Sequence, residues 1–210
     1  MELREIGPDI FSLKVSLPLD VESVNLYVFR GDVPTLLDAG TKTPAVYEEI
    51  QNGLKVLGIN RLEQVIATHW HVDHAGGAEN LAQNGARVLI GSRDYEEWVG
   101  FAQGETLELF QRWAETDWGV PRKEISAMIN IYDRLNVLTS LPNKVEKIED
   151  QQIIRAGNMD IKAIHTPGHT AGHLSFYEEK NNLFFSGDML LPNQIPYPGI
   201  WLQEGQVVSG

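Results

Sequence analysis

The sequence contains no cysteine, which excludes disulfide bonds, thiolate metal ligands and a cysteine nucleophile. It also lacks any apolar run near the roughly 20 residues of a membrane-spanning helix, so we expect no contact with a membrane. Positive charge is scarce, because 17 Lys and Arg face 29 Asp and Glu and leave a net charge of −12. A protein of this charge repels phosphate backbones, and we therefore expect no nucleic-acid partner.

The length of 210 residues fits one compact domain, because domains commonly hold roughly 100–200 residues. We therefore predict that residues 1–210 form a single domain. The first eight residues have neither the basic start nor the apolar stretch of a signal peptide. Together with the absence of cysteine, this favours a cytoplasmic location.

Apolar spacing and turn residues predict an alternation of strands and helices in the first ninety residues. Thr43 followed by Pro44 is typical of a helix start, and a second short helix is expected at residues 76–83. Strands are predicted at residues 9–15, 23–30, 33–37, 62–68 and 86–90. This alternation indicates an α/β sheet with helices packed on it.

Residues 92–140 differ in character, because aromatic and aliphatic side chains recur there at helical spacing. We predict three helices that form an insert within the domain. Strands then return at residues 147–154, 159–165, 173–177 and 182–186. Residues 195–201 are loop-like and residues 205–210 offer no closing element, so we expect the final elements of the fold to be missing.

All six histidines fall in two short segments, each at the end of a predicted strand: His69, His71, His74, His165, His169 and His173. Residues two apart in an extended chain point the same way, so His69 and His71 can present two imidazoles to one metal ion. Asp73 shares their parity and His74 follows it. This loop can therefore hold two adjacent ions.

Two further side chains can complete this site. His169 follows a Pro-Gly turn that projects it from a strand end, and it can supply the third imidazole of the first ion. Asp188 follows an apolar strand, where its carboxylate can bridge both ions. The remaining histidine of interest, His165, reads as a structural residue at a strand end, and Trp70 as a packing residue.

Four segments resemble the motifs of the metallo-β-lactamase superfamily, in the same order along the chain. They are Asp-Ala-Gly at 38–40, Thr-His-Trp-His-Val-Asp-His at 68–74, Thr-Pro-Gly-His-Thr-Ala-Gly-His at 166–173 and Ser-Gly-Asp at 186–188. The resemblance implies an αββα sandwich with the helical insert at about 92–140 as a cap beside the metal loops. The cap is either a core of its own or a wall of the substrate site.

The same resemblance implies a role for each motif residue. His69, His71 and His169 bind the first metal, while Asp73, His74 and the bridging Asp188 bind the second. For Asp38 the family implies an orienting neighbour, although a plain turn aspartate is the alternative. His173 either donates a hydrogen bond near the metal loop or is a structural histidine at a strand start.

One departure from the family pattern concerns the second metal. The family supplies a further histidine downstream of the bridging aspartate, whereas this sequence has no histidine after His173. We therefore expect a chain that is truncated at its C-terminus and a second metal site that is under-coordinated, with weak activity as the result.

Imidazole and carboxylate ligands without thiolate suit Zn²⁺, and Mn²⁺ or Fe²⁺ accept the same ligands. The resemblance implies a hydrolase of the glyoxalase II-like group that cleaves a small ester, thioester or lactone with a metal-bound hydroxide held by Asp73. Its partner is then a small-molecule acyl substrate. The alternatives are a phosphodiesterase or nuclease of the same superfamily, which the negative charge disfavours, and a catalytically silent metal-binding domain.

Overall fold

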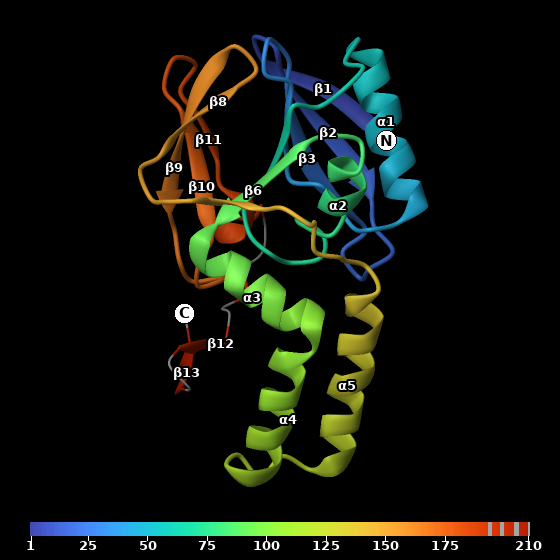
Figure 1. Ribbon diagram of the computed structural model, residues 1–210, viewed down its shortest axis with the longest axis vertical. Helices are drawn as coiled ribbons and strands as arrows, with labels where there is room; N and C mark the ends of the chain where they lie inside the picture. Colours follow the sequence, from blue (N-terminus) through green and yellow to red (C-terminus); the bar gives the residue numbers. More distant parts are fainter. Residues whose placement is uncertain (193–194, 198–199, 204–205, 210) are drawn as a thin grey trace.

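Two β-sheets packed face to face form the body of the protein (Figure 1). The structure is a computed structural model that describes residues 1–192, 195–197, 200–203 and 206–209. The larger sheet has the order β1 (Glu2–Gly7), β2 (Ile10–Ser16), β3 (Ser23–Phe29), β4 (Thr35–Leu37), β5 (Gln64–Ala67), β6 (Arg87–Gly91), β7 (Glu146–Ile148). The smaller sheet has the order β11 (Leu183–Phe185), β10 (Leu174–Glu178), β9 (Met159–His165), β8 (Ile153–Ala156).

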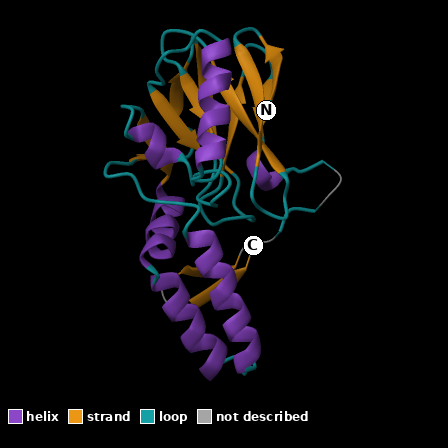
Figure 2. Ribbon diagram, turned by 90° about the vertical axis from the view of Figure 1, so that its right-hand side faces the viewer, coloured by secondary structure: helices purple, strands orange, loops and turns teal. Residues whose placement is uncertain are grey.

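The larger sheet is antiparallel from β1 to β4 and parallel from β4 to β7. Helices α1 (Pro44–Val56) and α2 (Ala78–Ala82) cover its outer face (Figure 2). Helix α1 begins where predicted, because the Thr43 hydroxyl accepts a hydrogen bond from the N–H of Val46 at 3.3 Å. In the described part of the chain, no α-helix covers the outer face of the smaller sheet (Figure 1), so three of the four expected layers are seen.

Two hydrophobic cores lie on either side of the larger sheet. Neighbouring residues of one strand point into opposite cores, so Leu36 packs with helix α1 whereas Leu37 packs between the sheets. Val65 and Ile66 of β5 divide in the same way. Strands covered on both faces therefore read as continuous apolar runs, which is why periodicity alone does not show which face meets which layer.

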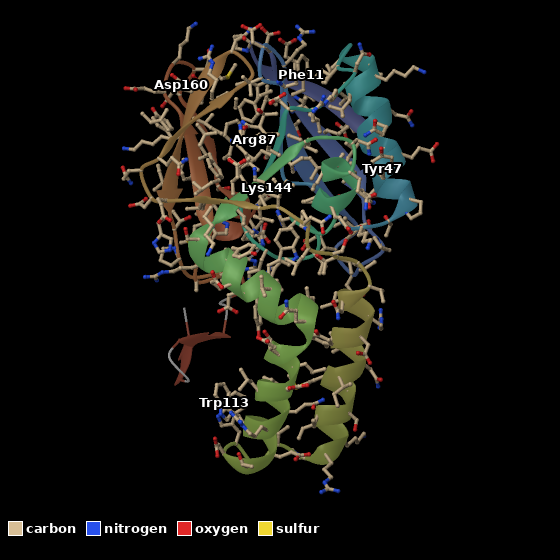
Figure 3. The ribbon with its side chains drawn as sticks, in the orientation of Figure 1. Phe11, Tyr47, Arg87, Trp113, Lys144 and Asp160 are labelled. Carbon is tan, nitrogen blue, oxygen red and sulfur yellow. The ribbon has the colours of Figure 1, made fainter. Side chains whose placement is uncertain are left out.

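The insert forms three helices as predicted, α3 (Ser92–Gln103), α4 (Glu105–Thr116) and α5 (Arg122–Asn136). Helix α3 packs against β6 and β7, while α4 and α5 run side by side away from the sandwich (Figures 1 and 2). Trp113 lies near the far end of α4 (Figure 3). Each of these two outer helices has a single buried residue, Ala114 in α4 and Ile125 in α5. Of the helices in the described ranges, none has the length and apolarity to cross a membrane.

Three sequence predictions about strands are wrong. The strand expected at 147–154 is two strands in different sheets, because Gln151 takes a left-handed conformation (φ +64°) and the chain turns between β7 and β8. The edge strand β1 is absent from the prediction, since none of its residues is buried and they lack an apolar alternation. The third error concerns the last residues of the chain.

Residues expected to be loop-like contain a strand pair instead. Strands β12 (Ile200–Gln203) and β13 (Gln206–Ser209) are antiparallel, with Trp201 opposite Val208 and Leu202 opposite Val207. Trp, Val and Ile favour strands, so the local composition is compatible with this pair. Positions 198–199, 205 and 210 of the predicted segments lie outside the described residues.

Candidate metal centre

The predicted ligands come from loops that follow three strands. The segment with His69, His71, Asp73 and His74 follows β5, the segment with His169 follows β9, and Asp188 follows β11. Strands β5 and β9 belong to different sheets. The site therefore draws its side chains from both halves of the sandwich, which pack together at this end.

Three histidines form a first cluster. His69, His71 and His169 each offer a ring nitrogen, and these nitrogens lie within 4.8 Å of one another. His71 Nδ1 and His169 Nε2 are 2.9 Å apart. The other nitrogen of His169, Nδ1, lies 2.8 Å from the carbonyl oxygen of Tyr197 and donates to it, which leaves Nε2 directed at the cluster.

A second cluster shares His69 with the first. His69, His74 and Asp188 again offer atoms within 4.8 Å of one another. Asp188 Oδ1 lies 3.2 Å from His74 Nε2 and Asp188 Oδ2 lies 3.6 Å from His169 Nε2. This carboxylate therefore stands between the two clusters. Asp73 lies beside the second one, with Oδ2 3.6 Å from His74 Nε2.

Asp38 positions two of these histidines from the side that faces away from the clusters. Its left-handed backbone (φ +64°) turns the carboxylate into the interior, where Oδ2 accepts a hydrogen bond from His74 Nδ1 at 2.9 Å. Its Oδ1 accepts from the backbone N–H and the hydroxyl of Thr68 at 2.8 and 3.0 Å. The same hydroxyl lies 3.0 Å from His69 Nδ1 and accepts a hydrogen bond from it. One carboxylate thus positions His74 directly and His69 through Thr68.

His173 holds the loop that carries Asp188. Its Nε2 accepts a hydrogen bond from the backbone N–H of Asp188 at 3.2 Å, and its Nδ1 lies 2.9 Å from the hydroxyl of Thr166. Gly187 permits this approach, because a Cβ there would lie 2.6 Å from His173 Nε2 and φ is +52°. His173 is therefore hydrogen-bonded to both the loop of Asp188 and Thr166, and Nε2 accepts rather than donates at the Asp188 loop. His165 lies apart and donates to the carbonyl oxygen of Ala171 at 2.9 Å.

The protonation states of His69 and His71 suit metal ligands. Burial lowers the pKa of His69 well below its ordinary value and that of His71 to about 3, and the neighbouring imidazoles add to both effects. Both rings are therefore neutral at pH 7, and neutral imidazole is the form that binds metals.

His74 differs: burial alone would lower its pKa, but the carboxylates of Asp38, Asp73 and Asp188 raise it well above its ordinary value, so this ring must lose a proton to bind a metal. Burial alone would raise the pKa of Asp188, but the hydrogen bond from His74 and the nearby histidines lower it to about 2.

The described residues fit a divalent metal ion. His69 Nε2 is fully buried and has no hydrogen-bond partner in the described part of the chain. An unpaired buried polar atom costs about 1–3 kcal/mol, and a bound ion would satisfy it. Imidazole nitrogens and carboxylate oxygens are ligands of Zn²⁺ and of other divalent transition metals.

Sequence reasoning missed three groups near the clusters. Thr68 was seen only as part of a motif, and the carbonyl of Tyr197 lies in a segment without secondary structure. The third is Asp94, which contacts both ligand loops. A signal for it existed, because Asp94 follows β6, and β6 runs parallel to β5, so both strands end at the same edge.

Comparison with known proteins agrees with the fold and the site. Residues 19–208 match the family model described as the metallo-beta-lactamase superfamily. The chain therefore belongs to the metallo-beta-lactamase superfamily, whose members bind divalent metal ions and include hydrolases.

Individual relatives are distant. The chain is 27% identical over 196 residues to the probable metallo-hydrolase YqjP of Bacillus subtilis. The match covers 90% of this chain and 60% of the relative. The chain is 24% identical over 160 residues to the hydroxyacylglutathione hydrolase GloC of Haemophilus influenzae, covering 76% and 62%. A metallo-beta-lactamase family protein of Thermus thermophilus has the same fold, with a TM-score of 0.77, 23% identity and coverage of 91% and 63%. The chain thus spans about 60% of the length of these proteins.

Proposed function

We propose that the protein is a dinuclear metal-dependent hydrolase, most simply a zinc enzyme, that cleaves a small ester, thioester or lactone. The observation that carries this proposal is the pair of clusters that share His69 and are spanned by Asp188. The name of the Haemophilus relative, a hydroxyacylglutathione hydrolase, supports an acyl substrate.

The residues of the two clusters have different roles in the proposed hydrolysis. His69, His71 and His169 hold one ion, while His74, Asp188 and Asp73 hold the other. When bound, such ions act as Lewis acids that polarise a substrate carbonyl and lower the pKa of water. Asp73 accepts a hydrogen bond from the attacking water at a carboxylate oxygen and takes its proton. Its side chain is only partly buried, so it can face both the second ion and the incoming substrate.

Two histidine substitutions, one inside and one outside the clusters, provide the test. The protein is stripped of metal with a chelator and reloaded with Zn²⁺, Mn²⁺ or Fe²⁺, and hydrolysis of a generic thioester, ester, lactone and phosphodiester is followed. Activity on an acyl substrate should return with metal and be lost in His71→Asn. The matched control is His165→Asn, because His165 lies outside both clusters. Cleavage of only the phosphodiester would favour the nuclease alternative, and no cleavage with two bound ions would favour the silent metal-binding domain.

The two metal positions should differ in affinity. The first cluster offers three imidazoles, whereas the second offers one imidazole beyond the shared His69 together with carboxylates. Titration of Zn²⁺ into metal-free protein should therefore show a tight and a weaker step. Asp73→Asn should weaken only the second step, by about 10-fold or more. Two equally tight steps in the unmodified protein would contradict this assignment.

A further inference from the structure

The first turn of α3 lies directly against the loop of residues 166–173. A Cβ on Gly172 would lie 2.3 Å from the backbone nitrogen of Asp94, and one on Gly91 would lie 2.6 Å from the carbonyl oxygen of Gly172. Only glycines allow the two backbones to approach so closely. The approach places the Asp94 side chain, which is 0% exposed, between the two loops that carry the metal ligands.

Both carboxylate oxygens of Asp94 are used. Oδ2 accepts hydrogen bonds from the backbone N–H of Trp70 at 3.0 Å and from the hydroxyl of Thr170 at 2.8 Å. Oδ1 accepts from the backbone N–H of Gly172 at 2.6 Å. Hydrogen bonds to a charged acceptor are about twice as strong as neutral ones. The carboxylate is therefore a strong link between the loop after β5 and the loop after β9.

Two of these donors are chain neighbours of the first cluster. Trp70 lies between His69 and His71, and Thr170 directly follows His169. A single oxygen atom of one buried side chain thus joins the peptide that separates two ligands to the residue that follows the third. The three histidines of the first cluster follow strands of two different sheets. The hydrogen bonds of Asp94 join the two loops next to these histidines and therefore bear on the distance between them.

We propose that Asp94 is a positioning residue that holds the two ligand loops at the separation that the three-histidine cluster requires. It makes none of its hydrogen bonds to a ligand side chain, so its effect on the metal is indirect. An amide cannot replace it, because the NH₂ group would face at least one N–H or O–H donor. The inference rests on the metal site of the proposed function.

The experiment measures metal binding rather than hydrolysis. Metal-free protein is titrated with Co²⁺ alone, and the dissociation constant and the visible absorption spectrum of the bound ion are recorded. Asp94→Asn should weaken binding at least tenfold and change the spectrum, because outer partners of ligands commonly affect metal affinity by 10–100-fold. Thr170→Val, which removes one of the three hydrogen bonds, should weaken binding about threefold.

Glu97→Gln is the matched control. Glu97 lies one turn further along α3 and makes no hydrogen bond to either ligand loop, both of which the structure describes in full. Its removal should leave the Co²⁺ affinity and spectrum unchanged. The metal-free Asp94→Asn protein should remain folded, because burial already raises the pKa of this carboxyl to about 6 and thus penalises its charge.

The outcomes separate the two proposals. Failure of the unmodified protein to bind Co²⁺ would overturn the metal site itself. Tight binding by the unmodified protein together with an Asp94→Asn affinity within twofold and an unchanged spectrum would overturn only the positioning role. If circular dichroism shows that Asp94→Asn is unfolded, Thr170→Val decides: a weaker and spectrally altered site supports the role, and an unchanged one overturns it.

Discussion

Three of the histidines at the clusters have one ring nitrogen bound by a protein group and the other directed inward. His69 is bound by Thr68, His74 by Asp38 and His169 by the carbonyl oxygen of Tyr197. Such partners fix both the tautomer and the angle of the ring. At the scale of single residues, the geometry of the site is therefore set by groups that touch no metal.

Asp38 provides the sharpest test of this arrangement. In Asp38→Asn the new NH₂ group faces either His74 Nδ1–H or the donors of Thr68, so one histidine loses its partner. We expect metal affinity to fall about 10–100-fold, measured by competition with a chelator. Asp9→Asn, at an exposed pair with Arg30, is the control. A change within threefold would contradict the orienting role of Asp38.

Asp94 should also leave a signature in the pH dependence of stability. Burial raises its pKa from 3.8 to about 6, although the hydrogen bonds from Thr170, Gly172 and Trp70 and the charge of His165 act in the opposite direction. The native state therefore holds this proton more tightly than the unfolded state does. Stability from this group is highest at low pH and declines as pH rises through about 6.

Urea unfolding of metal-free protein measures this effect. From pH 5 to pH 7.5 the protein with Asp94 intact should lose about 1.4 kcal/mol relative to Asp94→Asn, since one pKa unit corresponds to about that energy. The difference between the two proteins cancels the titration of groups that do not sense Asp94. Glu97 does sense it, because burial and the Asp94 charge raise its pKa to about 7, so both proteins are compared in a Glu97→Gln background. A constant difference across this range would show that Asp94 does not ionise there.

The residues of the site differ in how far sequence could predict them. The candidate ligand histidines stand out because His69 and His71 are spaced two apart at a strand end and because all six histidines fall in two short segments. The groups that hydrogen-bond to these histidines and their loops are not evident from the sequence, since Tyr197 is 28 residues from His169 and Asp94 is 76 residues from Thr170. Such contacts exist only once the loops and α3 have packed together, and no local pattern marks them.

Among the elements, α3 and the α4–α5 hairpin differ in how they are held. Trp98 of α3 is fully buried and its indole N–H donates to the hydroxyl of Thr139 at 2.9 Å. The α4 and α5 helices bury a single residue each, and α5 reaches α3 through Tyr132, which contacts Phe101. The anchored part of the insert is therefore its base.

Hydrogen exchange should show this difference. Few buried contacts mean that α4 and α5 can open without unfolding of the sheets. We expect their amides to be at least about 100-fold less protected than those of β5, a difference of about 2.8 kcal/mol. The amides of α3 should be protected from exchange to the same degree as those of the sheets. Equal protection of α4 and β5 would mean that the hairpin unfolds only with the whole protein.

Strand predictions failed at the element scale for a physical reason. Residues 147–154 have the composition of one strand, yet β7 pairs with β6 in the larger sheet and β8 pairs with β9 in the smaller one. The break lies at a polar turn where the Asp150 carboxylate accepts the backbone N–H of His165. The choice between sheets depends on these long-range bonds and not on local propensity.

At the scale of the whole molecule, a bound metal would join the two sheets. His69 follows a strand of the larger sheet, whereas His169 follows a strand of the smaller one. A ligand that binds only the native state stabilises it by about 2.7 kcal/mol at 100 times its dissociation constant. For a protein of this size, the melting temperature should rise by roughly 5–10 °C.

Thermal unfolding with and without excess Zn²⁺ tests this linkage. The increase should disappear in His71→Asn, which removes a member of the first cluster, and persist in His165→Asn, which removes a histidine outside both clusters. A chelator should reverse it. An equal melting temperature of the unmodified protein with and without Zn²⁺ would show that the clusters do not bind Zn²⁺ in the native state.

The base of the insert has a consequence for how this protein can change over evolution. The chain leaves the sandwich after β6 and re-enters before β7, and these strands are hydrogen-bonded neighbours. The return is fixed where the carbonyl of Leu138 accepts from the N–H of Lys42 and Thr139 accepts from Trp98. The part of the α4–α5 hairpin that does not contact α3 can lengthen, shorten or be exchanged while Asp94 and Phe101 of α3 keep their contacts with the ligand loops. The turn between α4 and α5 is accordingly where a foreign hairpin or a reporter domain can be spliced in.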